Sequence, residues 1–217
     1  MHKHGKLITF EGGEGSGKTT LLEALYQHLL SLGFSVLKTR APGATEIGQK
    51  IRDLVLHQKV VLSKQAELFL FLADRAQHVE EILLPALKKN TIILCDRFND
   101  STVAYQGAAR GCDLAFIEKL CLFATGGLAP DLTLYLDVPP KIGLERAFSA
   151  IIKDGKEGYD RVEQEKLDFH EKVRAAYLNI AKQHGERVFL VDGSKSKQEV
   201  FQIALGKIIP CLQEKPC

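Results

Sequence analysis

Long apolar runs are missing from this sequence of 217 residues. None approaches the roughly 20 consecutive apolar residues that a membrane-spanning helix needs. The first ten residues, MHKHGKLITF, carry basic side chains but no extended apolar segment followed by a small-residue cleavage site, so we expect no signal peptide. We therefore expect a cytoplasmic protein with no membrane partner.

A cysteine framework and an excess of one charge are also lacking. The five cysteines are odd in number and contain no C-x-x-C pair, which indicates free or buried thiols in a reducing compartment. Basic residues outnumber acidic residues by only 29 to 27, so no polycationic face suited to bulk nucleic acid is expected. The composition favours a small-molecule partner and no nucleic acid.

The sequence does contain a regular alternation of short apolar runs and longer helix-like stretches. The strand-like runs cover residues 6–11, 34–39, 91–96, 131–137 and 187–192. They are too apolar for strands with one exposed face, which favours a parallel sheet covered on both sides. The helix-like stretches cover residues 18–32, 45–56, 63–87, 113–124, 141–152, 160–184 and 197–212.

This alternation predicts one α/β domain over residues 1–217, a three-layer sandwich with a five-stranded parallel sheet and helices on both faces. Three of the strand candidates end in aspartate, at Asp96, Asp137 and Asp192. Sites in such sheets lie at the carboxyl ends of strands, although most aspartates there only cap the following turn.

A glycine-rich motif, FEGGEGSGKTT, follows the first strand and precedes a helix. It fits G-x-x-x-x-G-K-[ST], the phosphate-binding loop (P-loop) of P-loop NTPases. Its glycines allow consecutive N–H groups to point at phosphates, while Lys18 reaches the β- and γ-phosphates and the Thr19 hydroxyl binds Mg²⁺. The residues predicted to hold ATP are Gly12, Gly13, Glu14, Gly15, Ser16, Gly17, Lys18, Thr19 and Thr20.

The P-loop alone does not distinguish hydrolysis from transfer of the phosphoryl group to a second molecule. A GTPase would be expected to carry a guanine-reading N-K-x-D element, and none occurs here.

In SKQAELFLFLADRAQ, Ser63 is a candidate N-cap with Glu67 in the first turn. Phe71 and Arg75 are four residues apart and share a helix face. An aromatic ring beside a guanidinium could stack on a nucleotide base while the guanidinium binds the phosphate of the same nucleotide. The alternative, that Phe71 is simply a buried residue of the apolar core, stays open.

Two further segments add polar side chains at strand ends. In DRFNDSTVAYQGAARG, Arg97 directly follows Asp96, and its planar fork suits bidentate phosphate binding. Helical spacing lets Thr102, Tyr105 and Gln106 line one wall of a pocket. In KTRAPGATEIG, Arg40 either holds a phosphate or braces the loop.

In the order and spacing of five segments, the sequence resembles the thymidylate kinase family of bacteria. These segments are FEGGEGSGKTT, TRAPGAT, FLADR, DRFNDSTVAYQG and YDRVEQE. The resemblance implies phosphorylation of dTMP to dTDP with ATP and Mg²⁺, and a homodimer formed by helix packing. The alternatives are another nucleoside monophosphate or deoxynucleoside kinase on the same scaffold, and a P-loop switch or ATPase that hydrolyses slowly.

The resemblance also implies roles for matching positions. Phe71 corresponds to the residue that stacks on thymine, and Arg75 to the one that reads the base edge or monophosphate. Arg97 corresponds to the arginine that bridges the two phosphate groups. Asp96 corresponds to the acid that organises Mg²⁺ and its bound water, and Glu14 to the acid that contacts the sugar 3′-hydroxyl. Thr102 and Gln106 match positions around the base, and Tyr105 matches the ring that crowds a ribose 2′-hydroxyl. Arg40 matches the arginine of the family loop that follows the second strand.

This sequence departs from the family pattern in two places. Ala41 stands where the family loop carries glutamate, and Ala44 where a second glycine is common. The lid, about residues 148–162, is longer and poorer in arginine. Because Gly15 offers no charge where some relatives have a P-loop arginine, we expect Lys156 and Arg161 to complete the catalytic charge of Lys18 and Arg97; Lys153 more resembles a solvated residue.

Overall fold

The computed structural model describes residues 5–57, 61–153 and 160–213. Within them the sheet has the order β2-β3-β1-β4-β5, and every neighbouring pair is parallel. The strands are β1 (Lys6–Glu11), β2 (Val36–Arg40), β3 (Ile92–Asp96), β4 (Leu132–Asp137) and β5 (Val188–Asp192). The predicted five-stranded parallel sheet is confirmed, with β1 at its centre.

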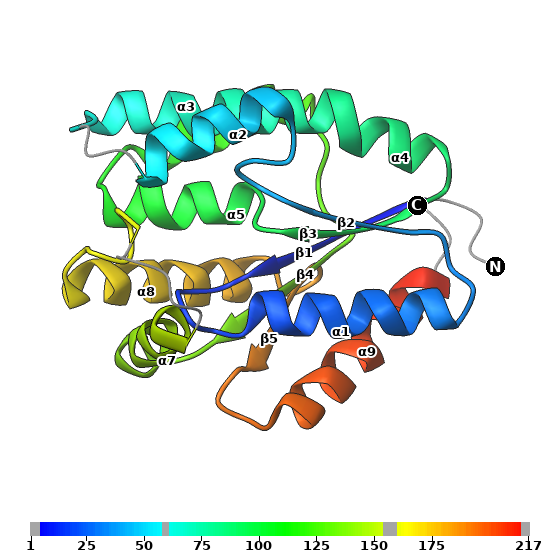
Figure 1. Cartoon of the computed structure of the whole chain (residues 1–217). Helices are drawn as coiled ribbons and strands as arrows, with labels where there is room; N and C mark the ends of the chain where they lie inside the picture. The colour runs from blue at the N-terminus through cyan, green and yellow to red at the C-terminus, as the bar shows by residue number, and fades with distance from the viewer. Residues whose placement is uncertain (1–4, 58–60, 154–159, 214–217) are drawn as a thin grey trace.

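Helices cover both faces of the sheet (Figure 1). On one face, α1 (Lys18–Ser31) and α9 (Lys197–Gln213) bury leucines and isoleucines against β1, β3 and β4. On the other face lie α3 (Lys64–His78), α4 (Leu84–Lys88), α5 (Asn99–Thr102) and α8 (Leu167–Gln183). The strands alternate side chains between these two layers, which is why both faces had to be apolar.

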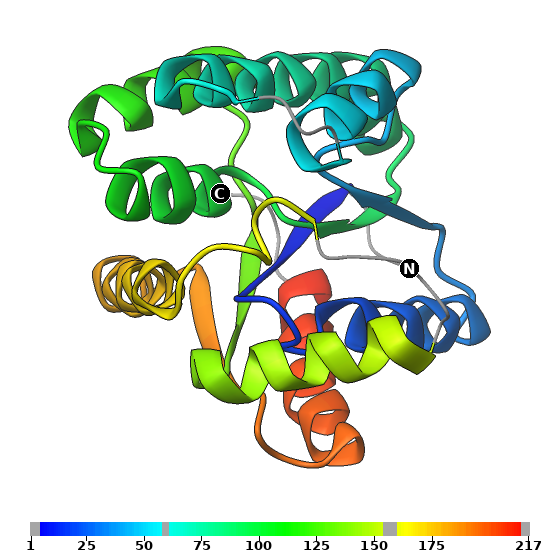
Figure 2. The same ribbon diagram turned by 60° about the vertical axis from the view of Figure 1, so that its left-hand side comes forward.

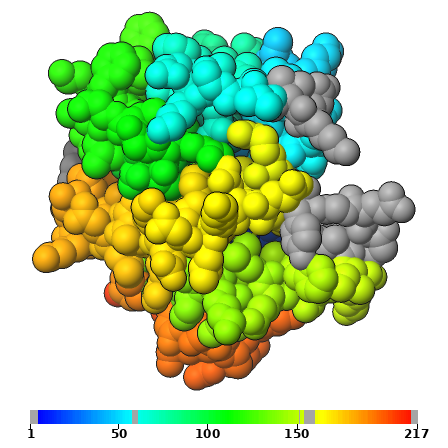
Figure 3. Space-filling view, turned by 90° about the vertical axis from the view of Figure 1, so that its left-hand side faces the viewer, coloured from blue at the N-terminus to red at the C-terminus, as the bar shows by residue number. Residues whose placement is uncertain are grey.

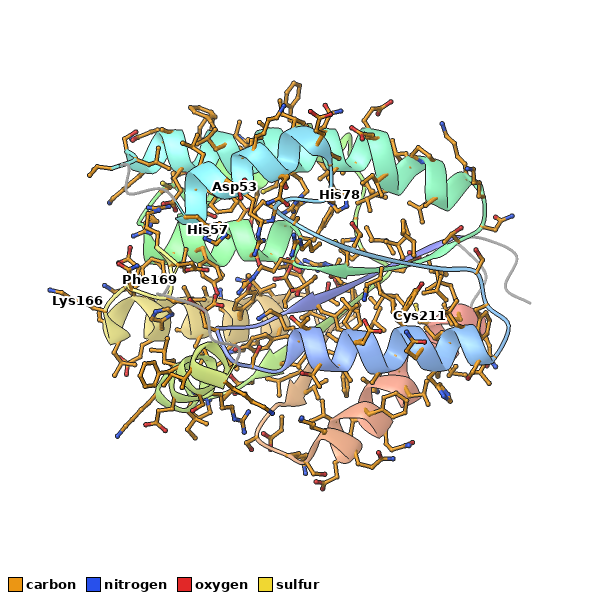
Figure 4. All side chains as sticks on the ribbon, in the orientation of Figure 1. Asp53, His57, His78, Lys166, Phe169 and Cys211 are labelled. Atoms are coloured by element: carbon orange, nitrogen blue, oxygen red, sulfur yellow. The ribbon has the colours of Figure 1, made fainter. Side chains whose placement is uncertain are left out.

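The remaining helices are α2 (Glu46–Arg52), α6 (Leu114–Thr125) and α7 (Pro140–Lys153). Ser63 caps α3, as predicted, by accepting a hydrogen bond from the Ala66 N–H at 3.2 Å. The expected helix over residues 63–87 is interrupted by a π-helical turn, η2 (Val79–Leu83). At the end of α3, His78 faces the sheet and pairs with Thr39 Oγ1 at 2.8 Å; burial lowers the pKa of its imidazole to about 3 (Figure 4).

Two helix predictions need correction. The stretch 160–184 does not begin as helix; α8 starts only at Leu167. The Asp160 carboxylate accepts the N–H groups of Val162 and Glu163, which stabilises a turn in competition with helix. Conversely, residues 99–109 form α5 and a π-helical segment, η3 (Val103–Ala109). This region was not among the predicted helix-like stretches, although helical spacing was assumed for Thr102, Tyr105 and Gln106.

The carboxyl ends of the strands meet at one edge of the sheet, and this edge comes forward in Figure 2. Figure 3 looks directly onto it. The yellow segment that returns the chain to α8 lies across the middle of this face, between the green residues near η3 and the yellow-green α7. Side chains from loops far apart in the sequence are therefore collected at a single edge.

Candidate active site

The P-loop leaves β1 and turns into α1 through glycines with left-handed backbone. Gly15 has φ +62°, and Gly17, the residue before α1, has φ +93°. A Cβ on Gly15 would lie 1.9 Å from the Gly143 carbonyl oxygen in α7. This close approach explains why the position holds no side chain, so an arginine finger is excluded there unless α7 moves.

Lys18 is held inside the loop by its own backbone. Its Nζ donates to the Gly12 and Gly13 carbonyl oxygens at 2.9 and 2.8 Å and to Ser16 Oγ at 3.2 Å. Burial, together with the nearby Arg97 charge, lowers the pKa of the Lys18 ammonium from 10.5 to about 8. A bound phosphate would supply the negative charge that this ammonium lacks.

Thr19 and Asp96 lie together at the start of α1 and the end of β3. Thr19 Oγ1 donates to Asp96 Oδ2 at 3.3 Å, and Asp96 Oδ1 is buried with no partner among the described residues. Oxygen atoms of this kind are the ligands that Mg²⁺ takes, usually completed by substrate phosphates and water. No cluster of three or more His, Cys, Asp or Glu side chains suited to a metal occurs in the described parts of the chain.

The other two strand-end aspartates are engaged elsewhere. Asp137 forms a bidentate ion pair with Arg174, with both N–O distances at 2.8 Å. Asp192 accepts the Ser194 N–H at 2.9 Å and caps the turn after β5. Of the three aspartates, only Asp96 lines the cleft described below.

Arg97 follows Asp96 with a left-handed backbone, φ +70°, which is uncommon for a residue with a side chain. Its Nη2 lies 2.7 Å from Glu14 Oε1, and its guanidinium covers the Tyr105 ring at 4.9 Å. Tyr105 donates its hydroxyl to the same Glu14 oxygen at 2.9 Å. Burial alone would raise the pKa of Glu14, but Arg97 and Lys18 hold it below its ordinary value.

A buried glutamate that the sequence analysis did not select supports Arg97 from behind. Glu11, the last residue of β1, accepts the Phe98 N–H at 2.6 Å, Ser101 Oγ at 2.5 Å and the Tyr177 hydroxyl at 2.8 Å. Ser101 and Tyr177 in turn contact Arg97 Nη1. Burial raises the pKa of Glu11. These contacts fix the unusual backbone that aims Arg97 at the cleft.

A cleft of about 1150 Å³ opens along this edge of the sheet. It brings together most of the predicted site residues: Glu14, Gly15, Ser16, Gly17, Lys18, Thr19, Thr20, Arg40, Phe71, Arg75, Asp96, Arg97, Thr102, Tyr105 and Gln106. Gly12 and Gly13 lie behind its wall and contribute their carbonyl groups to Lys18. One continuous cavity thus holds the P-loop and the second predicted pocket.

The second pocket is formed by α3, α5 and η3. Phe71 is half-buried: it lines the cleft and also packs against the apolar cluster around α8. Arg75 is buried, with its guanidinium 4.5 Å from the Phe98 ring centre and its Nη1 2.8 Å from Asn99 Oδ1. Thr102 and Gln106 also line the cleft. An aromatic face, a guanidinium and polar groups therefore converge as the sequence predicts.

Sequence reasoning missed several lining residues. Arg52 in α2 reaches the cleft near Arg40, and burial with the Arg40 charge lowers its pKa. At the other end, Arg146 in α7 donates to the Gly193 carbonyl oxygen at 2.9 Å. Gly193 and the neighbouring Lys195 follow β5 and line the cleft. No local motif marks these positions; only the topology places them beside the P-loop.

The lid residues behave differently from the rest. Arg161 does not line the cleft; its Nη2 pairs with Glu67 Oε2, and its Nε donates to the Val55 carbonyl oxygen at 2.9 Å. Lys156 lies outside the described residues. Asp160 and Glu163, neither of them selected from the sequence, do line the cleft. The catalytic role of the two lid cations stays a prediction.

The P-loop lies beside the Thr19–Asp96 pair, and the same cleft holds a second pocket suited to a base and a phosphate. This arrangement defines a P-loop phosphotransferase. The family model for thymidylate kinase matches residues 10–203. The thymidylate kinase of Protochlamydia amoebophila is 48% identical over 93% of this chain and 91% of its own length; that of Desulfosudis oleivorans is 46% identical over 96% and 97%.

Among solved structures, the thymidylate kinase of Ehrlichia chaffeensis superposes with a TM-score of 0.77 at 29% identity, over 94% of this chain and 99% of that one. The chain belongs to the thymidylate kinase family. The family and the enzyme class expected from the sequence are thereby confirmed. In the described part of the chain, no helix has the length and apolar character to cross a membrane.

Proposed function

We propose that this protein transfers the γ-phosphoryl group of ATP to dTMP, producing ADP and dTDP, with Mg²⁺ at the P-loop. The observation that carries the proposal is the single cleft that joins the P-loop to the Phe71–Arg75 pocket. Two anionic substrates held in one cavity can be aligned for direct transfer, without release of the phosphoryl group to water.

The donor end is built around α1. The P-loop N–H groups and the α1 dipole bind the ATP phosphates, with Lys18 at the β- and γ-phosphates. The adenine base then extends toward Arg146, Gly193 and Lys195, which line the same cleft as the P-loop. Thr19 and Asp96 would hold Mg²⁺, which neutralises charge on the β- and γ-phosphates when bound.

The acceptor end is built around α3. Phe71 stacks on thymine, Arg75 contacts the base edge or monophosphate, and Arg97 bridges the two phosphate groups. Arg40 and Arg52 add positive charge on the same side. A monophosphate oxygen is already anionic at neutral pH, so the reaction needs alignment and charge neutralisation and not a general base.

The sugar is recognised near Glu14 and Tyr105. The Glu14 carboxylate, kept ionised by Arg97 and Lys18, accepts a hydrogen bond from the 3′-hydroxyl. We expect the Tyr105 ring, whose hydroxyl donates to Glu14, to crowd a ribose 2′-hydroxyl and so favour deoxyribose. Lys156 and Arg161 complete the charge around the moving phosphoryl group as the lid closes.

We propose further that the protein acts in the cytoplasm as a homodimer. α3 and α6 pack together through Leu68, Leu72, Ile117 and Cys121. These two helices also carry exposed apolar side chains, with Phe123 87% exposed: Phe69, Phe116, Leu122 and Phe123. We take these four residues as the apolar patch of the dimer, since exposed apolar patches mark association surfaces. Sedimentation should give a dimer that Phe123→Lys dissociates, and a monomeric wild type would contradict it.

A coupled ADP-release assay tests the catalytic proposal. ADP should appear with ATP, Mg²⁺ and dTMP, in equal amount to dTDP, and hardly at all when dTMP is omitted. Lys18→Ala should abolish turnover while the protein stays folded, because Lys18 contacts the loop and phosphate and not the apolar core. ADP release that is independent of dTMP would favour the ATPase alternative.

A further inference from the structure

Glu67 is a buried carboxylate that the proposed mechanism does not use. It lies on α3 four residues before Phe71, which lies four residues before Arg75, so the three share one face of the helix. Phe71 and Arg75 line the cleft, whereas Glu67 does not and is only 2% exposed. A charge is costly to bury unless it is paired, so its partners need an explanation.

The partners of Glu67 come from two other segments. Its Oε1 accepts Gln106 Nε2 at 2.9 Å and Arg110 Nε at 3.2 Å, and its Oε2 pairs with Arg161 Nη2. Burial by itself would raise the pKa of Glu67, but the hydrogen bonds from Gln106 and Arg161 hold it below its ordinary value. The group is therefore an ionised carboxylate, which accepts hydrogen bonds and cannot donate them.

This carboxylate leaves the Gln106 amide only one favourable orientation. The amide nitrogen must face Glu67, since the amide oxygen would meet another acceptor there. The Gln106 side chain also lines the cleft, and its Oε1 has no hydrogen bond to any described residue. An oriented acceptor is thus left available in the cleft that Phe71 also lines.

We propose that Glu67 makes the acceptor site selective for a pyrimidine with an N–H at ring position 3, by holding the Gln106 oxygen toward the base. The inference rests on the proposed function. Thymine and uracil present N3–H as a donor, whereas cytosine presents N3 as an acceptor. Cytosine would place a lone pair against the Gln106 oxygen, and reversing the amide would break its bond to Glu67.

The test compares kcat/KM for dTMP and dCMP in wild type and Glu67→Gln. An amide at position 67 offers both a donor and an acceptor, so either orientation of Gln106 is satisfied. The dTMP-to-dCMP ratio should fall at least about tenfold. In a Gln106→Leu background, the same change should have no further effect on the ratio, because Glu67 acts through Gln106.

Glu165→Gln is the matched control. Glu165 pairs with Arg110 Nη1 at 2.5 Å in the same cluster but makes no contact with Gln106. It should leave the ratio within about threefold of wild type. A purely structural role for Glu67 would lower thermal stability and slow both substrates equally. An unchanged ratio in Glu67→Gln, or an equal fall in Glu165→Gln, overturns the proposal.

A wild-type experiment keeps the proposal testable if Glu67→Gln fails to fold. dUMP and dCMP are matched in size, but dUMP presents N3–H and dCMP an N3 lone pair, so wild type should bind dUMP at least about tenfold more tightly than dCMP. Equal affinity overturns the inference. If wild type does not phosphorylate dTMP at all, the proposed function fails; if it does and the ratio is independent of Glu67, only this inference fails.

Discussion

Lys18 is positioned by its own loop before any phosphate arrives. Two carbonyl oxygens and one hydroxyl accept its three N–H donors, and this satisfies the group without neutralising it. Arg97 is also held in place, by an ion pair with Glu14 and by contacts with Ser101 and Tyr177. Both cations are therefore preorganised, and Lys18, whose bonded partners are neutral, still lacks the negative charge that a substrate phosphate brings.

The depressed pKa of Lys18 gives a pH prediction. In the free enzyme Lys18 loses its proton as pH rises through about 8, so kcat/KM for ATP should fall over that range. Bound phosphates favour the protonated form, so kcat should fall only at higher pH. Because the unfolded lysine keeps its proton to 10.5, stability should rise between pH 8 and 10.5, and unfolding cannot account for the loss.

Steady-state kinetics and thermal unfolding across pH 7 to 10 would check both signs. Lys18→Arg, whose charge persists throughout this range, provides the control and should show no decline near pH 8 if it retains activity. A wild-type kcat/KM that stays constant well above that pKa would show that Lys18 is not the titrating group.

Phe71 gives a second prediction at the same scale. Phe71→Ala should weaken dTMP binding by about 1–3 kcal/mol, the usual range for base–aromatic stacking, and leave ATP affinity nearly unchanged. Gln65→Ala is the matched control on the same helix, because Gln65 is exposed and lies outside both the cleft and the apolar patch. Calorimetry of both ligands measures the effect. A collapse in thermal stability with intact dTMP affinity would assign Phe71 to the core.

At the scale of elements, the segment 160–165 connects the lid to two parts of the fold, residues 55–56 and α3. The Arg161 N–H donates to the Leu56 carbonyl oxygen, and its side chain contacts Val55 and Glu67. Asp160 and Glu163 line the cleft from the same segment. The lid is therefore attached to α3, one of the helices that form the acceptor pocket, and to the segment after α2.

We predict that Arg161→Ala and Lys156→Ala each lower kcat far more than they raise either KM. Arginine fingers contribute about 10³–10⁵ in rate in related phosphoryl transfer, and a lysine less. Arg161 pairs with Glu67, so it must break this ion pair before it can contact the transferred phosphoryl group. It therefore acts either by exchanging Glu67 for the phosphoryl group or by holding the lid in place. Lys153→Ala, an exposed position at the end of α7, is the control.

Saturating ATP and dTMP isolate kcat in this comparison. If each variant retains kcat within about threefold of wild type, under 1 kcal/mol of barrier, the lid does not supply the missing charge. A loss confined to Arg161→Ala would place the function at the anchored end of the lid.

Local patterns predicted the strands well because their apolar character is a direct consequence of burial on both faces. They failed at 160–166, where Asp160 accepts backbone N–H groups and replaces helix by a turn. They also missed the helical segment 99–109, whose polar residues face the cleft and give no apolar stripe.

At the scale of the whole molecule, the site is a product of sheet order. β1 and β3 are neighbours, so Asp96 and Arg97 lie beside the P-loop although about eighty residues separate them. The sequence identified these residues through motifs. It could not identify Arg146 or Lys195, which reach the cleft only through chain crossovers, or Glu11 and Glu67, whose importance lies in their long-range partners.

The central claim is that one cleft passes a phosphoryl group from ATP directly to dTMP. The most direct measurement supplies ATP labelled at the γ-phosphate, with Mg²⁺, to an equimolar mixture of dTMP, dCMP, dAMP, dGMP, AMP and GMP, and separates the labelled products. The account predicts that the label appears predominantly in dTDP, with little in inorganic phosphate. Label found mainly in inorganic phosphate, or in another nucleoside diphosphate, would contradict it.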